Sequence, residues 1–91
     1  MNDEENVNIK LGYLIKKLRK KKGISGAELA KKLNVSQQQV SRYERGATKL
    51  SFEKLIELTI HLDLDLSKLK SEIEKEKEVY ISMNQEHYFN L

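Results

Sequence analysis

Apolar residues recur three and four positions apart through the first two thirds of the chain, in five separate stretches. This spacing places them on one face of a helix, so the sequence predicts an all-α fold of five helices, the first starting at Val7 or Asn8 and ending at Lys22. The side chains expected to form the core are Leu11, Leu14, Ile15, Leu18, Leu29, Ala30, Leu33, Val35, Val40, Tyr43, Phe52, Leu55, Ile56, Leu58, Leu62, Leu66, Leu69 and Ile73.

Polar residues mark the ends of these helices. Ser25 followed by Glu28 has the spacing of a capping box, which indicates that the second helix starts at this point. Asn34 follows the last apolar residue of that helix and tolerates the left-handed conformation in which helices often end. The other expected end residues are Ser36, Ser51 and Asp65 as N-caps and Gly23 as the stop of the first helix.

The third helix has a polar face without a packing role. Once Val40 and Tyr43 are assigned to the core, the residues left over are Gln37, Gln38, Gln39, Ser41, Arg42 and Arg45. Such residues most often form an ordinary solvated face. Here, two short helices meet at a tight turn, with the small Ala30 where the helices cross and Val35 in the turn. This arrangement indicates a helix-turn-helix unit whose second helix reads DNA.

The segment from about Ile9 to Leu69 resembles the phage repressor/Cro (XRE) family of helix-turn-helix proteins. The resemblance is carried by KLRKKKGIS (17–25), AELAKKLNVS (27–36), QQQVSRYERG (37–46) and LSFEKL (50–55). It implies a five-helix domain that binds double-stranded DNA as a homodimer and regulates transcription. The run SQQQVSRYERG is also similar to small regulators of fimbrial operons in enteric bacteria. Gly26 departs from the family, which usually has a glutamine or similar residue on a phosphate there, and Asn34 replaces a frequent glycine.

The resemblance also implies roles for individual residues. The residues expected to contact base edges are Ser36, Gln37, Gln38, Gln39 and Arg42, and those expected to contact phosphates are Ser25, Arg45, Thr48 and Lys49. Glutamine pairs with adenine and arginine with guanine in the major groove, whereas phosphate contacts set the register without reading sequence. Arg19 and Glu44 are expected to form a structural ion pair between the first and third helices.

Charge and composition agree with a DNA-binding protein. The 91 residues allow one domain with a net charge of +3, but residues 1–50 carry +7 and residues 51–91 carry −4, so the helix-turn-helix lies in the basic half. The chain has no cysteine, glycine-rich phosphate loop, nucleophile with a nearby base, or pair of histidines at ligand spacing. We therefore expect no enzyme activity, metal or cofactor, and a cytoplasmic protein that associates with the nucleoid through DNA.

The last residues have a different pattern. Val79, Ile81 and Met83 alternate with Tyr80 and Ser82, which is the period of a β-strand. A single strand needs a partner edge, so we expect these three residues to dimerise the protein or to contact another protein. Two other arrangements remain open, in which the segment folds back as coil or the fifth helix forms the dimer. The chain thus divides into a flexible N-terminus (1–8), a DNA-binding domain (9–70) and a C-terminal extension (71–91).

Two other functions fit the same pattern. An antitoxin of a toxin–antitoxin pair would use the domain to repress its own operon and the extension to cover the toxin. A protein-interaction module would keep the helix-turn-helix fold without binding DNA. Gene neighbourhood distinguishes the first from a free-standing regulator, and salt-dependent binding to random duplex DNA distinguishes the second.

Overall fold

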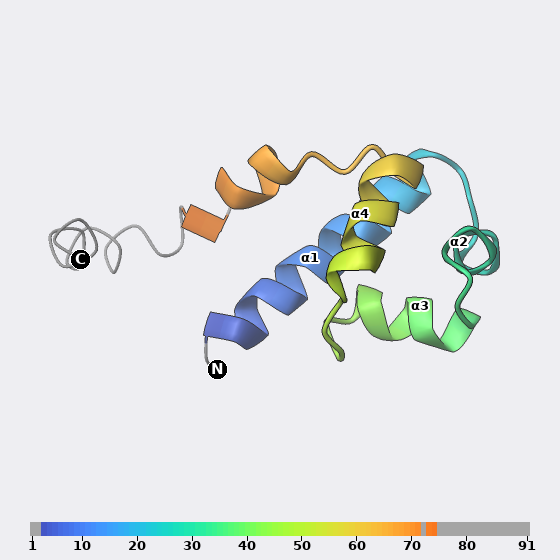
Figure 1. Ribbon diagram of the computed structural model, residues 1–91, viewed down its shortest axis with the longest axis horizontal. Coiled ribbons are helices and arrows are strands. Elements are labelled where there is room, and N and C mark those ends of the chain that lie inside the picture. The colour runs from blue at the N-terminus through green and yellow to red at the C-terminus, as the bar shows by residue number, and fades with distance from the viewer. Residues whose placement is uncertain (1–2, 72, 75–91) are drawn as a thin grey trace, which may run out of the picture.

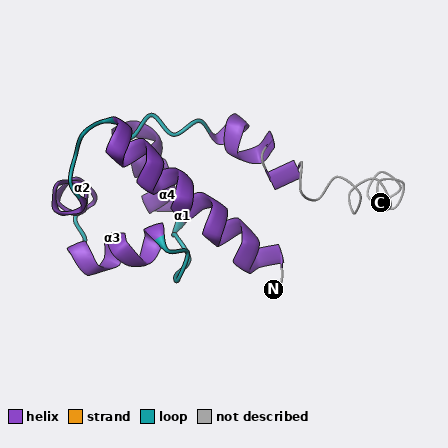
Figure 2. Cartoon of the chain, turned by 180° about the vertical axis from the view of Figure 1, so that it is seen from behind, coloured by secondary structure: helices purple, strands orange, loops and turns teal. Residues whose placement is uncertain are grey.

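The computed structural model describes residues 3–71 and 73–74, most of which are helical (Figure 1). The four helices are α1 (Asp3–Lys21), α2 (Gly26–Leu33), α3 (Gln37–Glu44) and α4 (Phe52–His61). A fifth helical segment comprises residues 66–71 and 73–74. Figure 2 shows only helices and loops in this part of the chain, so the predicted all-α class with five helices is confirmed. Val79, Ile81 and Met83 lie outside the described residues.

Helix α1 begins at Asp3, earlier than the expected start at Val7 or Asn8. Acidic residues suit the first turn of a helix because the helix dipole is positive at that end, and residues 3–5 are all acidic. The other end is as predicted. Gly23 has φ of 72°, and its N–H donates to the carbonyl of Lys20 at 3.0 Å, which closes the helix.

The predicted capping residues all occupy the ends of helices. The Ser25 hydroxyl accepts from the Glu28 N–H at 3.0 Å and the Glu28 carboxylate accepts from the Ser25 N–H at 3.2 Å, which completes the capping box of α2. Asn34 ends α2 with φ of 55°. The remaining caps accept from backbone N–H groups: Ser36 from Gln39 at 3.0 Å, Ser51 from Lys54 at 3.1 Å, and Asp65 from Ser67 at 2.9 Å.

All four helices contribute side chains to one core. Its buried members are Leu11, Leu14, Ile15, Leu29, Ala30, Leu33, Val40, Tyr43, Leu58, Leu62, Leu64 and Leu69, and Leu18, Ile24, Val35, Leu50, Leu55 and Ile73 pack against them. The core therefore covers the inner faces of the helix-turn-helix and holds α2 and α3 in a fixed relationship to α1 and α4.

Three residues expected in the core are on the surface instead. Phe52, Ile56 and Leu66 are 77%, 37% and 40% exposed. In α4 the face turned inward is the one that carries Leu58 and Leu62, which are fully buried. Phe52 and Ile56 lie four residues apart on a different face of the same helix, so they do not reach the core.

Two glycines allow α1 to approach the end of α3 closely. A Cβ atom at Gly12 would lie 2.3 Å from the carbonyl oxygen of Tyr43, and one at Gly46 would lie 2.6 Å from Cα of Ile9. Both distances are shorter than any normal contact of a Cβ atom. Backbone therefore packs on backbone here, and the C-terminal end of α3 is set directly on the first half of α1.

Candidate nucleic-acid interface

The helix-turn-helix consists of α2, a three-residue turn and α3. Figure 1 shows α2 nearly end-on and α3 from the side, so the two helices cross at a large angle. Val40 and Tyr43 are 1% and 7% exposed and fix the inner face of α3 against the core. The outer face of α3 is left open to the surroundings.

The outer face of α3 is lined by four polar side chains at positions i, i+3, i+4 and i+7. Gln38, Ser41, Arg42 and Arg45 surround a shallow hollow of about 370 Å³, and we call this set the α3 face. All four residues are exposed. Within the part of the chain that the structure describes, none of the four side chains makes a hydrogen bond or ion pair. The α3 face therefore presents amide, hydroxyl and guanidinium groups that are available to a ligand.

The five predicted base-contacting residues do not all lie on this face. Gln38 and Arg42 do. Ser36 is the N-cap of α3, so its hydroxyl oxygen already accepts from the Gln39 N–H. Gln37 lies on the side of α3 next to α2, where its side chain passes the α carbon of Gly26, and a Cβ at Gly26 would be 3.9 Å from Cγ of Gln37. Gln39 is half-buried.

The predicted phosphate-contacting residues lie around the two ends of the helix-turn-helix. Ser25 is exposed at the start of α2, where its hydroxyl caps the helix. Thr48 is half-buried and Lys49 exposed in the loop between α3 and α4. Arg45 shares the α3 face with Gln38 and Arg42, and that face also includes Ser41. Sequence reasoning misses Ser41 as a site residue, although its position three residues after Gln38 is a sufficient signal.

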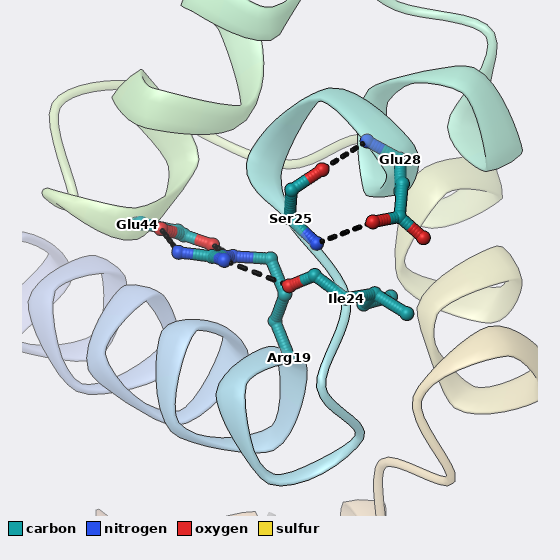
Figure 3. A network of polar contacts seen from close by, with 5 residues as sticks. All are labelled: Arg19, Ile24, Ser25, Glu28 and Glu44. Carbon is teal, nitrogen blue, oxygen red and sulfur yellow. Dashed lines mark hydrogen bonds and ion pairs between the residues drawn. The ribbon is translucent and has the colours of Figure 1, made fainter.

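Arg19 and Glu44 connect α1 to the C-terminal end of α3 (Figure 3). Nε and Nη2 of Arg19 donate to the two carboxylate oxygens of Glu44 at 2.6 and 3.1 Å, and Nη1 donates to the carbonyl oxygen of Ile24 at 2.9 Å. The hydrogen bond to Glu44 raises the pKa of Arg19 above its ordinary value, although partial burial opposes this. The pair thus holds the recognition helix, α1 and the approach to α2 together.

Lys54 of α4 makes a similar connection to the end of α2. Its Nζ donates to the carbonyl oxygen of Leu33 at 2.6 Å and lies 3.0 Å from Oε2 of Glu57. Leu33 is the last residue of α2, whose final carbonyls have no partner within the helix. The hydrogen bond with Glu57 raises the pKa of Lys54. A lysine on one helix thereby completes the cap of another, a contact that no local sequence pattern indicates.

A third ion pair lies at the far end of α4. Nζ of Lys22 is 2.7 Å from Oδ2 of Asp63, and both side chains are substantially exposed. Asp63 has φ of 54°, a left-handed conformation in which aspartate and asparagine are among the tolerated residues. The hydrogen bond from Lys22 lowers the pKa of the Asp63 carboxyl. This pair joins the end of α1 to the turn before the fifth helical segment.

The family model of the helix-turn-helix proteins of the XRE type matches residues 15–69, which is more than half of the chain. The chain therefore belongs to this family, whose members are DNA-binding transcriptional regulators rather than enzymes. No curated protein matches the sequence significantly. None of the helices in the described part of the chain is long and apolar enough to span a membrane.

Proposed function

We propose that this protein is a sequence-specific regulator of transcription that binds double-stranded DNA as a homodimer in the cytoplasm. The observation that carries the proposal is the α3 face. Four polar side chains on one helix face are exposed and unengaged, while the other side of that helix is fixed by the core and by the Arg19–Glu44 pair. A rigid helix with a free polar face has the size and chemistry to enter a major groove.

In this proposal Gln38 and Arg42 read base edges from the middle of the α3 face. The amide of Gln38 can donate to and accept from adenine, and the guanidinium of Arg42 can donate twice to guanine. Ser36 and Gln37 reach bases at the start of α3, on the side of α2, and Gln39 contacts the flank of the same groove. The five residues would together read a short half-site.

Phosphate contacts flank this reading surface. Ser25 lies at one end of the helix-turn-helix, and Arg45, Thr48 and Lys49 follow the other end. Contacts at both ends would fix the angle at which α3 enters the groove without adding sequence preference. The +7 charge of residues 1–50 adds a general attraction to the phosphate backbone.

A single α3 face reads too few base pairs for useful specificity, which supports the homodimer. The likeness of SQQQVSRYERG to fimbrial regulators makes a fimbrial or phage-derived operon the proposed target. An antitoxin that represses its own operon remains the alternative, and a small toxin gene beside this gene would favour it.

Selection from a pool of random duplex DNA by the purified full chain, followed by sequencing, tests the proposal. We expect enrichment of a two-fold symmetric site with half-sites one helical turn apart, about 10 base pairs centre to centre. The variant with both Gln38→Ala and Arg42→Ala should no longer enrich it. Absence of any salt-dependent binding would instead favour a protein-interaction module.

A further inference from the structure

The outer surface of α4 carries three large apolar side chains that remain exposed. Phe52, Ile56 and Ile60 are 77%, 37% and 68% exposed. They follow one another at intervals of four residues, so they lie along one side of the helix as a single stripe. We call these three residues the α4 stripe.

Helix α4 already uses another face for the core, where Leu58 and Leu62 are fully buried. A helix at the surface of a globular domain is normally apolar on the inner face alone. Isolated exposed apolar residues are common, but a row of three large ones on one helix marks an interaction site. The α4 stripe therefore needs an occupant that the domain itself does not supply among its described residues.

The charges of α4 argue against a nucleic acid as this occupant. The lysine of α4, Lys54, is engaged by the Leu33 carbonyl and by Glu57. The remaining charged side chains of the helix are the acidic Glu53 and Glu57. A polyanion would find no available cation here and would meet like charge. The occupant is therefore an apolar protein surface.

We infer that a second copy of this chain covers the α4 stripe, with the two stripes antiparallel across a two-fold axis near Ile56. The inference rests on the proposed function, in which two copies of α3 occupy one operator. A two-fold interface requires a surface that is complementary to itself. The stripe meets this requirement, because an axis at its central residue places Phe52 of one copy beside Ile60 of the partner subunit.

The size of the stripe indicates a weak dimer. Three side chains of this kind present on the order of 300 Å² of apolar surface, less than half of the roughly 800 Å² per partner in a standard stable interface. The dimer would therefore exchange with monomer in solution and be held together on DNA, where two adjacent half-sites raise the effective concentration of each copy. Since the stripe carries no charge, added salt should not weaken the dimer, although it weakens DNA binding.

Sedimentation equilibrium of the full chain, with and without substitutions in the stripe, tests the inference. Phe52→Gln and Ile60→Gln remove apolar surface without changing charge, and neither side chain is in the core. Tyr13→Gln on α1 is the matched control, because Tyr13 is 69% exposed and Ile60 is 68% exposed. We expect dimerisation to be at least tenfold weaker in the stripe variants and unchanged in the control. Circular dichroism should show the same helix content in all of them.

DNA titrations separate this inference from the proposed function. The stripe variants should lose at least tenfold in affinity for a duplex with two half-sites and keep full affinity for a duplex with one. Stripe variants that dimerise like the unsubstituted chain, or a chain that is monomeric at every concentration and on the two-site duplex, would overturn the inference and leave DNA binding intact. The same holds if Val79→Asp with Ile81→Asp abolishes the dimer and the stripe variants do not. Loss of binding to all duplexes in the unsubstituted chain would count against the proposed function alone.

Discussion

The guanidinium of Arg19 grips the carboxylate of Glu44 through two hydrogen bonds, 25 positions apart along the chain. The side chains are only 13% and 9% exposed, so water does little to replace either partner. Arg19 also donates to the Ile24 carbonyl just before α2. One side chain therefore sets α1, α2 and α3 relative to one another, which makes the pair a determinant of how the reading surface is aimed.

Removing either partner of this pair should destabilise the fold. Glu44→Gln or Arg19→Met would leave a poorly hydrated charged group without its partner, at a cost of about 1.5–3 kcal/mol in the free energy of unfolding. Urea denaturation followed by circular dichroism measures this cost. The double variant should cost less than the sum of the two single ones, and strict additivity would show that the pair is energetically unimportant.

The backbone contact at Gly12 leads to a prediction with an internal control. Gly12→Ala would place a Cβ atom 2.3 Å from the Tyr43 carbonyl, so α1 and α3 must move apart. Overpacking of this kind costs about 1–3 kcal/mol, which outweighs the better helix propensity of alanine.

Gly26→Ala is the matched control for this change. Its Cβ would meet only the flexible Gln37 side chain, at 3.9 Å, so the domain should unfold at the same or a higher urea concentration. Equal losses of stability in the two variants would mean that the close approach of α1 to α3 has no special role.

Local patterns in the sequence were enough to predict the helices and their ends. Ser25, Asn34 and Ser36 act through atoms within a few residues of themselves, so their roles follow from spacing alone. The start of α1 and the surface position of Phe52 did not follow in the same way. Apolar spacing identifies a helix, but which of two apolar faces turns inward depends on how α4 sits on the other helices.

The candidate site divides along the same line. Gln38 and Arg42 could be assigned from the sequence because an outward position on α3 follows from the inward positions of Val40 and Tyr43. The contact of Lys54 with Leu33 and the close approach at Gly12 join segments that are far apart in the chain. They depend on tertiary geometry, and no periodicity or short motif encodes them.

The Lys22–Asp63 pair should make stability depend on pH in one direction. Because the folded pKa of Asp63 is lowered, its contribution is fully present above the unfolded value of about 3.9 and is lost as the pH falls through the folded value. Asp63→Asn keeps a residue that tolerates the left-handed conformation and removes the charge. The urea midpoint of this variant should lie below that of the unsubstituted chain at pH 6, and the two should converge near pH 2.5. A gap that is independent of pH would assign the effect to something other than this pair.

Phosphate contacts should be visible in the salt dependence of binding. Arg45→Ala or Lys49→Ala should weaken binding to all duplexes alike and lower the slope of log affinity against log salt by about one unit for each phosphate that the variant no longer neutralises. Fluorescence anisotropy on random and selected duplexes over a range of salt concentrations measures this slope. Glu53→Gln, which changes the charge by the same amount on α4, serves as the comparison and should leave the slope nearly unchanged. An unaltered slope in both Arg45 and Lys49 variants would remove these residues from the interface.

Base reading by the α3 face should appear as a loss that depends on the DNA sequence. Gln38→Ala or Arg42→Ala should cost about 1–3 kcal/mol on the selected site and relax the preference at one base pair in each half-site. Binding to random duplex should change little, because phosphate contacts dominate that binding. Ser41→Ala changes the same face without removing a bidentate group, so we expect a smaller loss from it. Competition titrations against duplexes altered at single positions give the preference directly. If Arg42→Ala weakens binding to selected and random duplexes equally, Arg42 contacts phosphate, and the reading role on this face passes to Gln38 and its neighbours at the start of α3.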